Sequence, residues 1–398
     1  MKMITRIMLP MFACLAFHAI AENQASPKKG SEEIPIWAVG AAMPSEETLK
    51  YPDGHLSIMV SRASFKPGEY SFLHDPTIVE YKNGLFAAWY NCPKAEMQET
   101  SVIRGSRSQD GGKTWSAPEM IASDKDNKGI MYVPVALINH KDKLYAFVTN
   151  MKGGVDLVHD CEIFLLDEEA KQWKSQGFLG SPFLPNTPPR KMPDGNFIMA
   201  GRVASEAGKM PKIPAVAISD GDNLTGKWKI VKLLPGGLLP GGEEPDCPET
   251  TLVIDEKEMT AFVRGQYSKK LDDNSRPFVF KSTDNGQTWS EPVKGNLPMG
   301  AAKIYAGKLS TGQRYILYNL PSKPRRNIIV LTVSKPGETQ FIKAWKLCDG
   351  INAELKAKPE YAYPSALESN GKLYVVYSAM KRNCIMSVIP IDSLGAKE

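Results

Sequence analysis

The segment SQDGGKTWS, residues 108–116, gathers an acid, two glycines and a lysine, residue types that can bind phosphate or calcium. A phosphate-binding glycine loop needs a following helix, and a calcium loop needs several regularly spaced carboxylates. Neither feature follows residue 116. The residues fit a turn instead, because Asp110 can accept hydrogen bonds from its own backbone, Gly112 permits a conformation that a Cβ resists, and Trp115 buries a large ring. The segment therefore predicts a structural staple.

The tryptophans reveal the elements to which this staple belongs. Trp115, Trp173, Trp228, Trp289 and Trp345 are separated by 58, 55, 61 and 56 residues. A period of this length is typical of a repeat architecture.

Each repeat contains a hairpin in which β-branched and aromatic residues flank a turn rich in Gly, Asn, Asp or Lys. The six hairpins cover residues 76–90, 136–149, 190–202, 251–264, 303–319 and 365–378. A further strand leads toward the tryptophan in five repeats, whereas the sixth lacks its last strand, which we expect residues 55–63 to supply. The sequence thus predicts an all-β fold, a six-bladed β-propeller closed by its two chain ends. A two-sheet sandwich with a second domain does not explain the period.

Two segments carry a resemblance to a known family. Ser108-x-Asp110-x-Gly112-x-x-Trp115 and Ser282-x-Asp284-x-Gly286-x-x-Trp289 resemble the Asp box of sialidases and related bacterial neuraminidase repeat proteins. The resemblance covers roughly residues 55–392 and implies a sialidase-like propeller. It also implies that the boxes lie away from the substrate and that the site lies at the other end of the axis, where the innermost strands begin.

At the first of these strands the chain departs from the family. The family's Arg-Ile-Pro, which gives the first of three arginines that clamp a substrate carboxylate, corresponds here to His74-Asp75-Pro76. A histidine cannot reproduce a permanently charged, bidentate clamp. His74, beside Asp75, is instead a candidate for proton transfer or a packed residue at a strand start. The loop that holds the family's acid/base aspartate offers Glu96 and Glu99.

The other site residues follow from the resemblance at the later repeats. Arg264 and Arg326 match the second and third clamp arginines, with Arg325 as an alternative to Arg326. Tyr363, or Tyr361, matches the nucleophilic tyrosine, and Glu249, or Glu244, matches the glutamate that activates it. Asn186, Arg190 and Lys303 are further candidates for sugar contacts.

These residues favour an exported carbohydrate-active enzyme, an exo-acting glycoside hydrolase on acidic glycans that resembles exo-α-sialidases. The missing arginine keeps two alternatives open. One is a glycosidase or polysaccharide lyase that is directed at uronic acids and uses His74, and the other is a glycan-binding propeller without catalysis.

The remaining features of the sequence concern the domain bounds, the localisation and the partners of the protein. Residues 1–21 read as a secretory signal peptide, residues 22–54 as an N-terminal extension and residues 55–398 as the propeller, so we expect a periplasmic or secreted protein. The net charge of +5 is spread along the chain and does not suggest nucleic acid, and no stretch is apolar enough to span a membrane. Five scattered cysteines after the signal argue against a zinc site. We expect a monomer without cofactor or metal.

Overall fold

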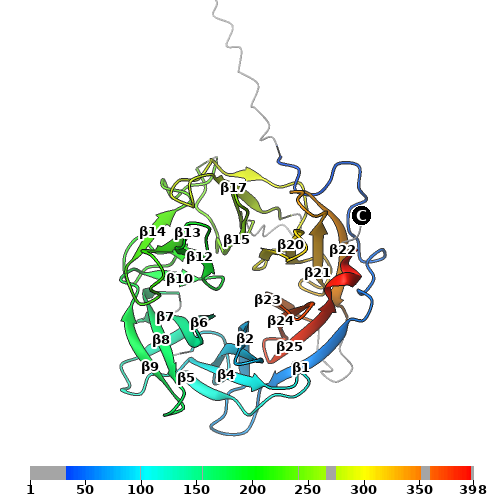
Figure 1. Ribbon diagram of the computed structural model, residues 1–398. Helices are drawn as coiled ribbons and strands as arrows, with labels where there is room; N and C mark the ends of the chain where they lie inside the picture. Colours follow the sequence, from blue (N-terminus) through cyan, green and yellow to red (C-terminus); the bar gives the residue numbers. More distant parts are fainter. Residues whose placement is uncertain are drawn as a thin grey trace, which may run out of the picture. The chain divides into compact units, whose positions relative to one another are not determined.

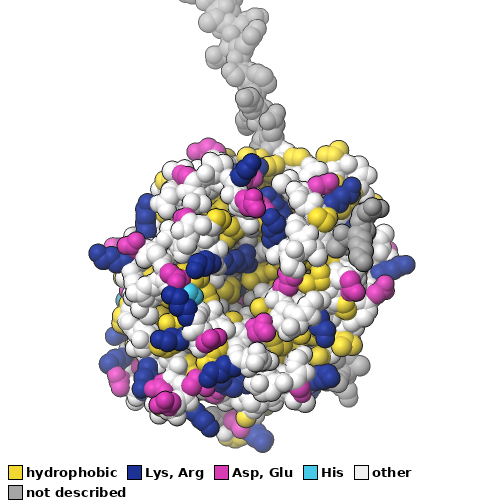
Figure 2. All heavy atoms as spheres, viewed as in Figure 1, with side chains coloured by type: hydrophobic (Ala, Val, Ile, Leu, Met, Phe, Trp, Pro, Cys, Tyr) yellow, Lys and Arg dark blue, Asp and Glu magenta, His cyan; other side chains and the backbone are white. Residues whose placement is uncertain are grey.

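A computed structural model describes residues 33–395, except 99, 155, 241, 266–274 and 351–358. Six antiparallel sheets are arranged as a ring around a central axis (Figure 1). The predicted all-β, six-bladed propeller is confirmed. Viewed along the axis, the molecule is hollowed at its centre, and lysine and arginine side chains gather there (Figure 2).

The strands of each blade follow one another from the axis outward. Blade one consists of β2 (Phe72–Tyr81), β3 (Gly84–Cys92), β4 (Val102–Ser108) and β5 (Glu119–Ala122). Blade two consists of β6 (Ile130–His140), β7 (Lys143–Lys152), β8 (Val158–Asp167) and β9 (Gln172–Phe178). Blade three consists of β10 (Phe183–Pro185), β11 (Arg190–Lys191), β12 (Phe197–Val203), β13 (Ile213–Ser219) and β14 (Trp228–Lys232). Blade four consists of β15 (Thr250–Ile254), β16 (Met259–Val263), β17 (Phe278–Ser282) and β18 (Val293–Lys294). Blade five consists of β19 (Tyr305–Lys308), β20 (Arg314–Asn319), β21 (Ile329–Ser334) and β22 (Phe341–Cys348). Blade six consists of β23 (Tyr361–Ser369), β24 (Lys372–Ala379), β25 (Asn383–Pro390) and β1 (Leu56–Arg62), and a short 3₁₀ helix, η1 (Ile391–Leu394), follows β25.

The ring closes in blade six, where the first strand of the chain pairs with the last. Leu56 of β1 lies opposite Val388 of β25 in an antiparallel register. The predicted completion of the sixth sheet by residues 55–63 is thereby confirmed. The pairing adds β1 as the fourth strand of this sheet and joins the two ends of the propeller within one blade.

Blade three differs from the predicted hairpin at residues 190–202. Its innermost strand is divided into β10 and β11, which both pair with β12. Pro188 and Pro189 lie between the two parts, and proline has no N–H group to donate to a neighbouring strand.

The core lies between the blades, because each sheet packs its two faces against two neighbours. All nine residues of β3 are buried. A strand that is buried on both faces has a nearly continuous apolar sequence. This is why the second strand of each predicted hairpin is so hydrophobic. Residues 33–54 contribute to this core through Trp37, which is 2% exposed and packs with blades four and five. Among the described residues, no helix is long and apolar enough to cross a membrane.

The first Asp box forms the predicted staple. Asp110 accepts hydrogen bonds from Ser108 Oγ (2.8 Å) and the Thr114 N–H (2.9 Å), and Trp115 Nε1 donates to the Gly112 carbonyl (3.0 Å). The hydrogen bonds that Asp110 accepts lower its pKa to about 2, and the bond from the Thr114 hydroxyl has the largest effect. The second box repeats the same contacts at the same distances with Asp284, Gly286 and Trp289.

The box and His74 lie at opposite ends of blade one. Ser108, where the box begins, pairs with Leu85 at the start of β3, whereas His74 pairs with Tyr90 near the end of β3. The structure therefore agrees with the expectation that the boxes lie away from the candidate site.

Candidate active site

Three innermost strands carry a β-bulge near their first residues, at the same end of the blades. The register shifts between His74 and Thr77 in β2, between Tyr132 and Val135 in β6, and between Ala362 and Ser365 in β23. In the bulges of β2 and β23, Asp75 and Tyr363 adopt positive φ angles of 51° and 60°. A bulge changes the direction of a side chain, and non-glycine residues in this strained region are typical of functional sites.

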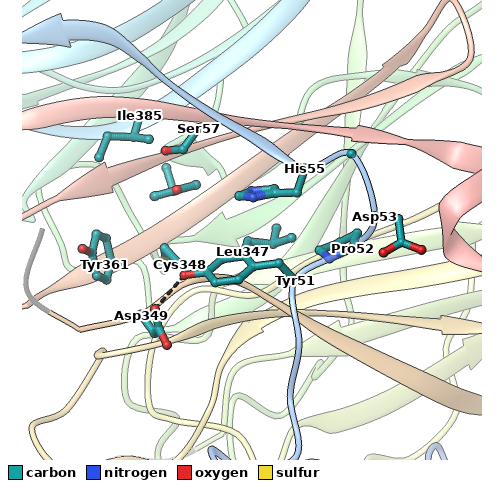
Figure 3. Close-up of a pocket in the computed structure, with 12 residues that line it drawn as sticks. Tyr51, Pro52, Asp53, His55, Ser57, Leu347, Cys348, Asp349, Tyr361 and Ile385 are labelled. Carbon is teal, nitrogen blue, oxygen red and sulfur yellow. Dashed lines mark hydrogen bonds between the residues drawn. The ribbon is translucent and has the colours of Figure 1, made fainter.

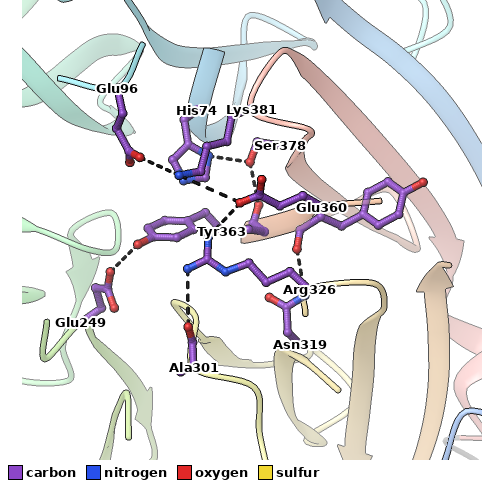
Figure 4. Close-up of polar contacts among 12 residues, drawn as sticks. His74, Glu96, Glu249, Ala301, Asn319, Arg326, Glu360, Tyr363, Ser378 and Lys381 are labelled. Carbon is purple, nitrogen blue, oxygen red and sulfur yellow. Dashed lines mark hydrogen bonds and ion pairs between the residues drawn. The ribbon is translucent and has the colours of Figure 1, made fainter. Parts of the chain in front are cut away.

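Tyr363 and Glu249 form a direct pair across the axis (Figure 4). Tyr363 Oη donates a 2.7 Å hydrogen bond to Glu249 Oε1, and Arg264 Nη1 donates a 2.8 Å bond to Glu249 Oε2. Burial alone would raise the pKa of Glu249, but the charges of Arg264 and Arg202 outweigh it, and the net pKa is lowered. Burial and the charge of Glu249 raise the pKa of Tyr363 well above its usual value. A protonated phenol thus faces an ionised carboxylate, which is the arrangement of a nucleophile and its base.

His74 packs directly against Tyr363, and their ring centroids are 4.3 Å apart. His74 Nδ1 lies 2.6 Å from Ser378 Oγ, while Ser378 Oγ donates its own hydrogen to the Ala362 carbonyl at 3.1 Å. Because a hydroxyl has one hydrogen to give, Nδ1 of His74 must carry the proton in this contact and Nε2 must hold a lone pair.

The surroundings of His74 keep it uncharged. Burial is the main cause of a pKa well below the usual value, and the cations Lys381, Arg326 and Lys303 lower it further. Nε2 has no hydrogen-bond partner within the described part of the chain. His74 is therefore a neutral, buried hydrogen-bond acceptor at neutral pH.

Asp75 turns toward Lys303 rather than toward His74. Lys303 Nζ lies 2.5 Å from Asp75 Oδ1, and both residues are buried. The same Nζ is 5.6 Å from the ring centroid of Tyr363. Lys303 thus lies near Tyr363, with its charge engaged by Asp75.

Two further ion pairs lie beside Tyr363 (Figure 4). Arg326 Nη1 is 3.3 Å from Glu360 Oε1, and the Arg326 guanidinium is 5.7 Å from the Tyr363 ring centroid. Lys381 Nζ is 2.6 Å from Glu96 Oε2. The predicted acid/base candidate Glu96 therefore belongs to this group, whereas Glu99 lies outside the described residues.

Several predicted residues serve elsewhere. Arg190 donates to the carbonyls of Leu252 (2.5 Å) and Ala306 (2.7 Å), so its guanidinium holds blades three, four and five together. Asn186 accepts a 3.0 Å bond from the Thr250 N–H. Glu244 pairs with Lys212 on the surface, so Glu249 is the glutamate at Tyr363.

Tyr361 lies in a different place from Tyr363. Its hydroxyl donates to the Gly350 carbonyl at 3.1 Å, and it lines a separate pocket of about 610 Å³ with Tyr51, His55 and Cys348 (Figure 3). Tyr363 is therefore the tyrosine that meets the glutamate.

The structure adds two residues that the sequence analysis missed, Arg202 and Asp156. Arg202 directly follows Gly201 in β12 and is 8% exposed, and Asp156 lies in the connection between β7 and β8. Arg202 lowers the pKa of Glu249, which places it beside the central pair. A signal for Arg202 existed, because it ends the hairpin 190–202 as Arg264 ends the hairpin 251–264. Asp156 had no such signal.

No cluster of three or more His, Cys, Asp or Glu residues that could hold a metal ion occurs among the described residues. Their five cysteines carry free thiols.

Three solved structures illustrate the fold that this chain shares. A protein of unknown function from Dyadobacter fermentans matches with a TM-score of 0.62 and 15% identity, over 84% of this chain and 99% of that chain. Trypanosoma rangeli sialidase in complex with sialic acid matches with a TM-score of 0.58 and 15% identity, over 91% and 60% of the two chains. The intramolecular trans-sialidase from Ruminococcus gnavus in complex with oseltamivir carboxylate matches with a TM-score of 0.60 and 11% identity, over 84% and 98%. At these identities the likeness shows the fold alone.

A family comparison covers most of the chain. No curated protein matches the sequence. The model of the BNR repeat-like domain matches residues 83–375. The chain therefore belongs to the BNR repeat-like family, as a divergent sialidase-like propeller.

Proposed function

We propose that this protein is an exo-acting glycoside hydrolase on acidic glycans, with Tyr363 as its nucleophile. The observation that supports the proposal is the 2.7 Å hydrogen bond from the Tyr363 phenol to the buried, ionised Glu249. A tyrosine is a suitable nucleophile at an anomeric centre that bears a carboxylate, because a carboxylate nucleophile would be repelled.

The reaction would take place in two steps. Tyr363 Oη attacks the anomeric carbon while its proton passes to Glu249, and the bond to the leaving oxygen breaks. That oxygen takes a proton from a carboxylic acid, for which Glu96 and Asp156 are the candidates among the described residues. Water then attacks the anomeric carbon and loses one proton to the carboxylate that had protonated the leaving oxygen. The bond to Tyr363 breaks, and Tyr363 recovers its own proton from Glu249.

The substrate carboxylate would bind to the arginines around Tyr363. Arg264 has an Nε without a hydrogen-bond partner among the described residues, so it retains a donor beyond its bond to Glu249. A guanidinium beside a carboxylate provides strong, directional hydrogen bonds.

A trapping experiment tests this proposal directly. Fluorinated sugar acids with a good leaving group, in the sialic and uronic series, form long-lived glycosyl–enzyme adducts with retaining enzymes. We expect one of them to label the protein at Tyr363, detected by peptide mass spectrometry, and Tyr363→Phe to remain unlabelled. Labelling at another residue, or hydrolysis of sialyl and uronyl glycosides that Tyr363→Phe performs equally well, would rule out this nucleophile.

One observation favours a second candidate, β-elimination from a uronic acid. His74 keeps an unprotonated, unpartnered Nε2 beside Tyr363, which is the state that a general base requires. In this reaction Nε2 takes the proton α to the carboxylate, a carbon–carbon double bond forms, and the glycosidic C–O bond breaks. The product is an unsaturated uronide that absorbs in the near ultraviolet, whereas a hydrolysis product does not.

A further inference from the structure

Arg202 is a buried arginine without a hydrogen bond to any residue in the described part of the chain. It is 8% exposed, and its Nε is fully buried without a partner. Its ion-pair contact, from Nη2 to Asp156 Oδ1, is 3.9 Å long and exceeds hydrogen-bond distance. A buried charge is normally paired and hydrogen-bonded, so this guanidinium indicates a partner beyond those that the described residues provide.

The other cations of the site are engaged by the chain. Arg264 is bound to Glu249 at 2.8 Å, Lys303 to Asp75 at 2.5 Å and Lys381 to Glu96 at 2.6 Å. Arg326 contacts Glu360 at 3.3 Å. Arg202 is therefore the cation of this group that is least compensated by described residues.

The position of Arg202 points to the junction of blades three and four. Arg264 Nη1 is bonded to Glu249 Oε2 at 2.8 Å, and Arg202 lies in β12, which contacts β15, the strand that directly follows Glu249. In agreement with this arrangement, both arginines lower the pKa of Glu249. Each has an Nε without a hydrogen-bond partner within the described residues. Cys247, which is partly exposed, also lies within the field of both arginines.

We propose that Arg202, together with Arg264, binds the carboxylate of a sugar acid at the junction of blades three and four. A guanidinium offers a planar fork of N–H donors that matches a carboxylate, which is the chemistry missing around Arg202. The assignment rests on the proposed function only in taking a sugar as the carrier of that carboxylate. Arg202, in blade three, would thereby take the place of the arginine that the family has in blade one, where this chain has His74.

Asp156 does not oppose this assignment. Burial is the largest cause of its raised pKa, followed by the opposing charge of Arg202 and by the carboxylates of Glu249 and Glu96, which raise the pKa further. The raised pKa favours the protonated form of Asp156, which repels an incoming carboxylate less and neutralises Arg202 less than an ionised carboxylate would.

The test is a binding measurement by calorimetry, with glucuronate and N-acetylneuraminate as acidic probes and N-acetylglucosamine as a neutral control. We expect an acidic probe to bind the unmodified protein, Arg202→Gln to weaken its binding at least tenfold, and Arg202→Lys to recover part of it. Arg326→Gln should weaken binding less than Arg202→Gln. Binding of both acids that is unchanged in Arg202→Gln, or no binding of either acid by the unmodified protein, would overturn the proposal.

A second readout separates binding from folding. Arg202→Gln removes a buried charge without hydrogen bonds, so its melting temperature should be equal to or higher than that of the unmodified protein. Arg190→Gln is the matched control, because Arg190 is also buried but donates to two backbone carbonyls, and this variant should melt at a lower temperature. A lower melting temperature for Arg202→Gln of the same size as for Arg190→Gln would assign Arg202 a structural role instead.

The proposed hydrolase activity and the proposed carboxylate site can be disproved independently of each other. If acidic sugars bind through Arg202 but no glycoside is cleaved, the proposed hydrolase is wrong and the carboxylate site stands. If glycosides are cleaved while Arg202→Gln binds and turns over like the unmodified protein, the carboxylate site is wrong and the hydrolase stands. Protection of the Cys247 thiol against alkylation by the bound sugar acid provides a signal that needs no turnover.

Discussion

Tyr363 and Glu249 are 114 residues apart in the chain, yet the phenol of one donates to the carboxylate of the other at 2.7 Å. Blades six and four bring them together across the axis, and the bulge in β23 gives Tyr363 its positive φ. Glu249 is shared, since Arg264 holds its second oxygen. The carboxylate of Glu249 therefore holds both Tyr363 and the buried Arg264.

Tyr363→Phe should abolish hydrolysis and leave binding intact. Loss of a nucleophile removes the covalent route, so we expect turnover to fall by at least roughly a thousandfold. Tyr361→Phe is the matched control, because its hydroxyl contacts the Gly350 carbonyl and not Glu249. A fall of the same size in Tyr361→Phe would contradict the choice between the two tyrosines.

Glu249→Gln should cost stability as well as activity. It leaves the buried Arg264 without its charged partner, which we expect to lower the free energy of unfolding by about 3 to 5 kcal/mol at neutral pH. The pKa of Glu249 is lowered from 4.5 in the folded protein, so its contribution is complete above pH 4.5 and is lost as the pH falls through the folded value. Denaturant melts at several pH values should show the difference between the two proteins shrinking in acid. A constant difference would contradict the ionised pair.

His74 should remain neutral where an ordinary histidine becomes charged. Its folded pKa lies well below 6.5, so the unfolded chain binds the proton first and stability falls as the pH drops below 6.5. His74→Asn should flatten this part of the pH profile. In nitrogen-detected NMR spectra we expect Nδ1 to carry hydrogen and Nε2 to carry none, and the opposite tautomer would contradict the contact with Ser378.

The acid that protonates the leaving group can be identified by leaving-group dependence. Loss of a general acid slows cleavage of substrates with poor leaving groups by roughly 10²- to 10⁴-fold and affects activated aryl glycosides far less. Asp156→Asn and Glu96→Gln should be compared on both substrate types. We expect the larger, leaving-group-dependent loss in Asp156→Asn, because Glu96 is held by Lys381 at 2.6 Å. The reverse pattern would assign the role to Glu96.

The Asp box should influence stability and not turnover. Gly111 and Gly112 both have positive φ, but a Cβ at Gly111 meets nothing within 4 Å, whereas one at Gly112 collides with the Met386 side chain. We expect Gly111→Ala to cost about 1 to 2 kcal/mol from backbone strain and Gly112→Ala to cost about 1 to 3 kcal/mol more from overpacking. Equal losses in urea melts, or a loss of turnover in folded Gly111→Ala, would contradict this division.

The sequence predicted the blades and part of the site for a physical reason. Strands, turns and the Asp boxes are local, so the tryptophan period and the six hairpins were enough to predict six blades and the closing strand at residues 55–63. The site is formed by contacts between distant blades, and there local patterns were ambiguous. Arg190 and Arg202 lie at the two ends of one predicted hairpin. The sequence analysis chose Arg190 as a sugar contact, but its guanidinium donates to two backbone carbonyls. Arg202 is the one of the two that makes no hydrogen bond to the part of the chain that the structure describes.

The pairing of β1 with β25 has a consequence for how the chain folds. Leu56 and Val388 lie opposite one another but are separated by 332 residues of chain. Closing so long a loop costs conformational entropy before any contact compensates it, and non-local pairing of this kind folds slowly. Strands β23, β24 and β25 can pair locally, whereas the fourth strand of this sheet comes from the far end of the propeller sequence. We therefore expect the pairing of β1 with β25 to be a late step of folding.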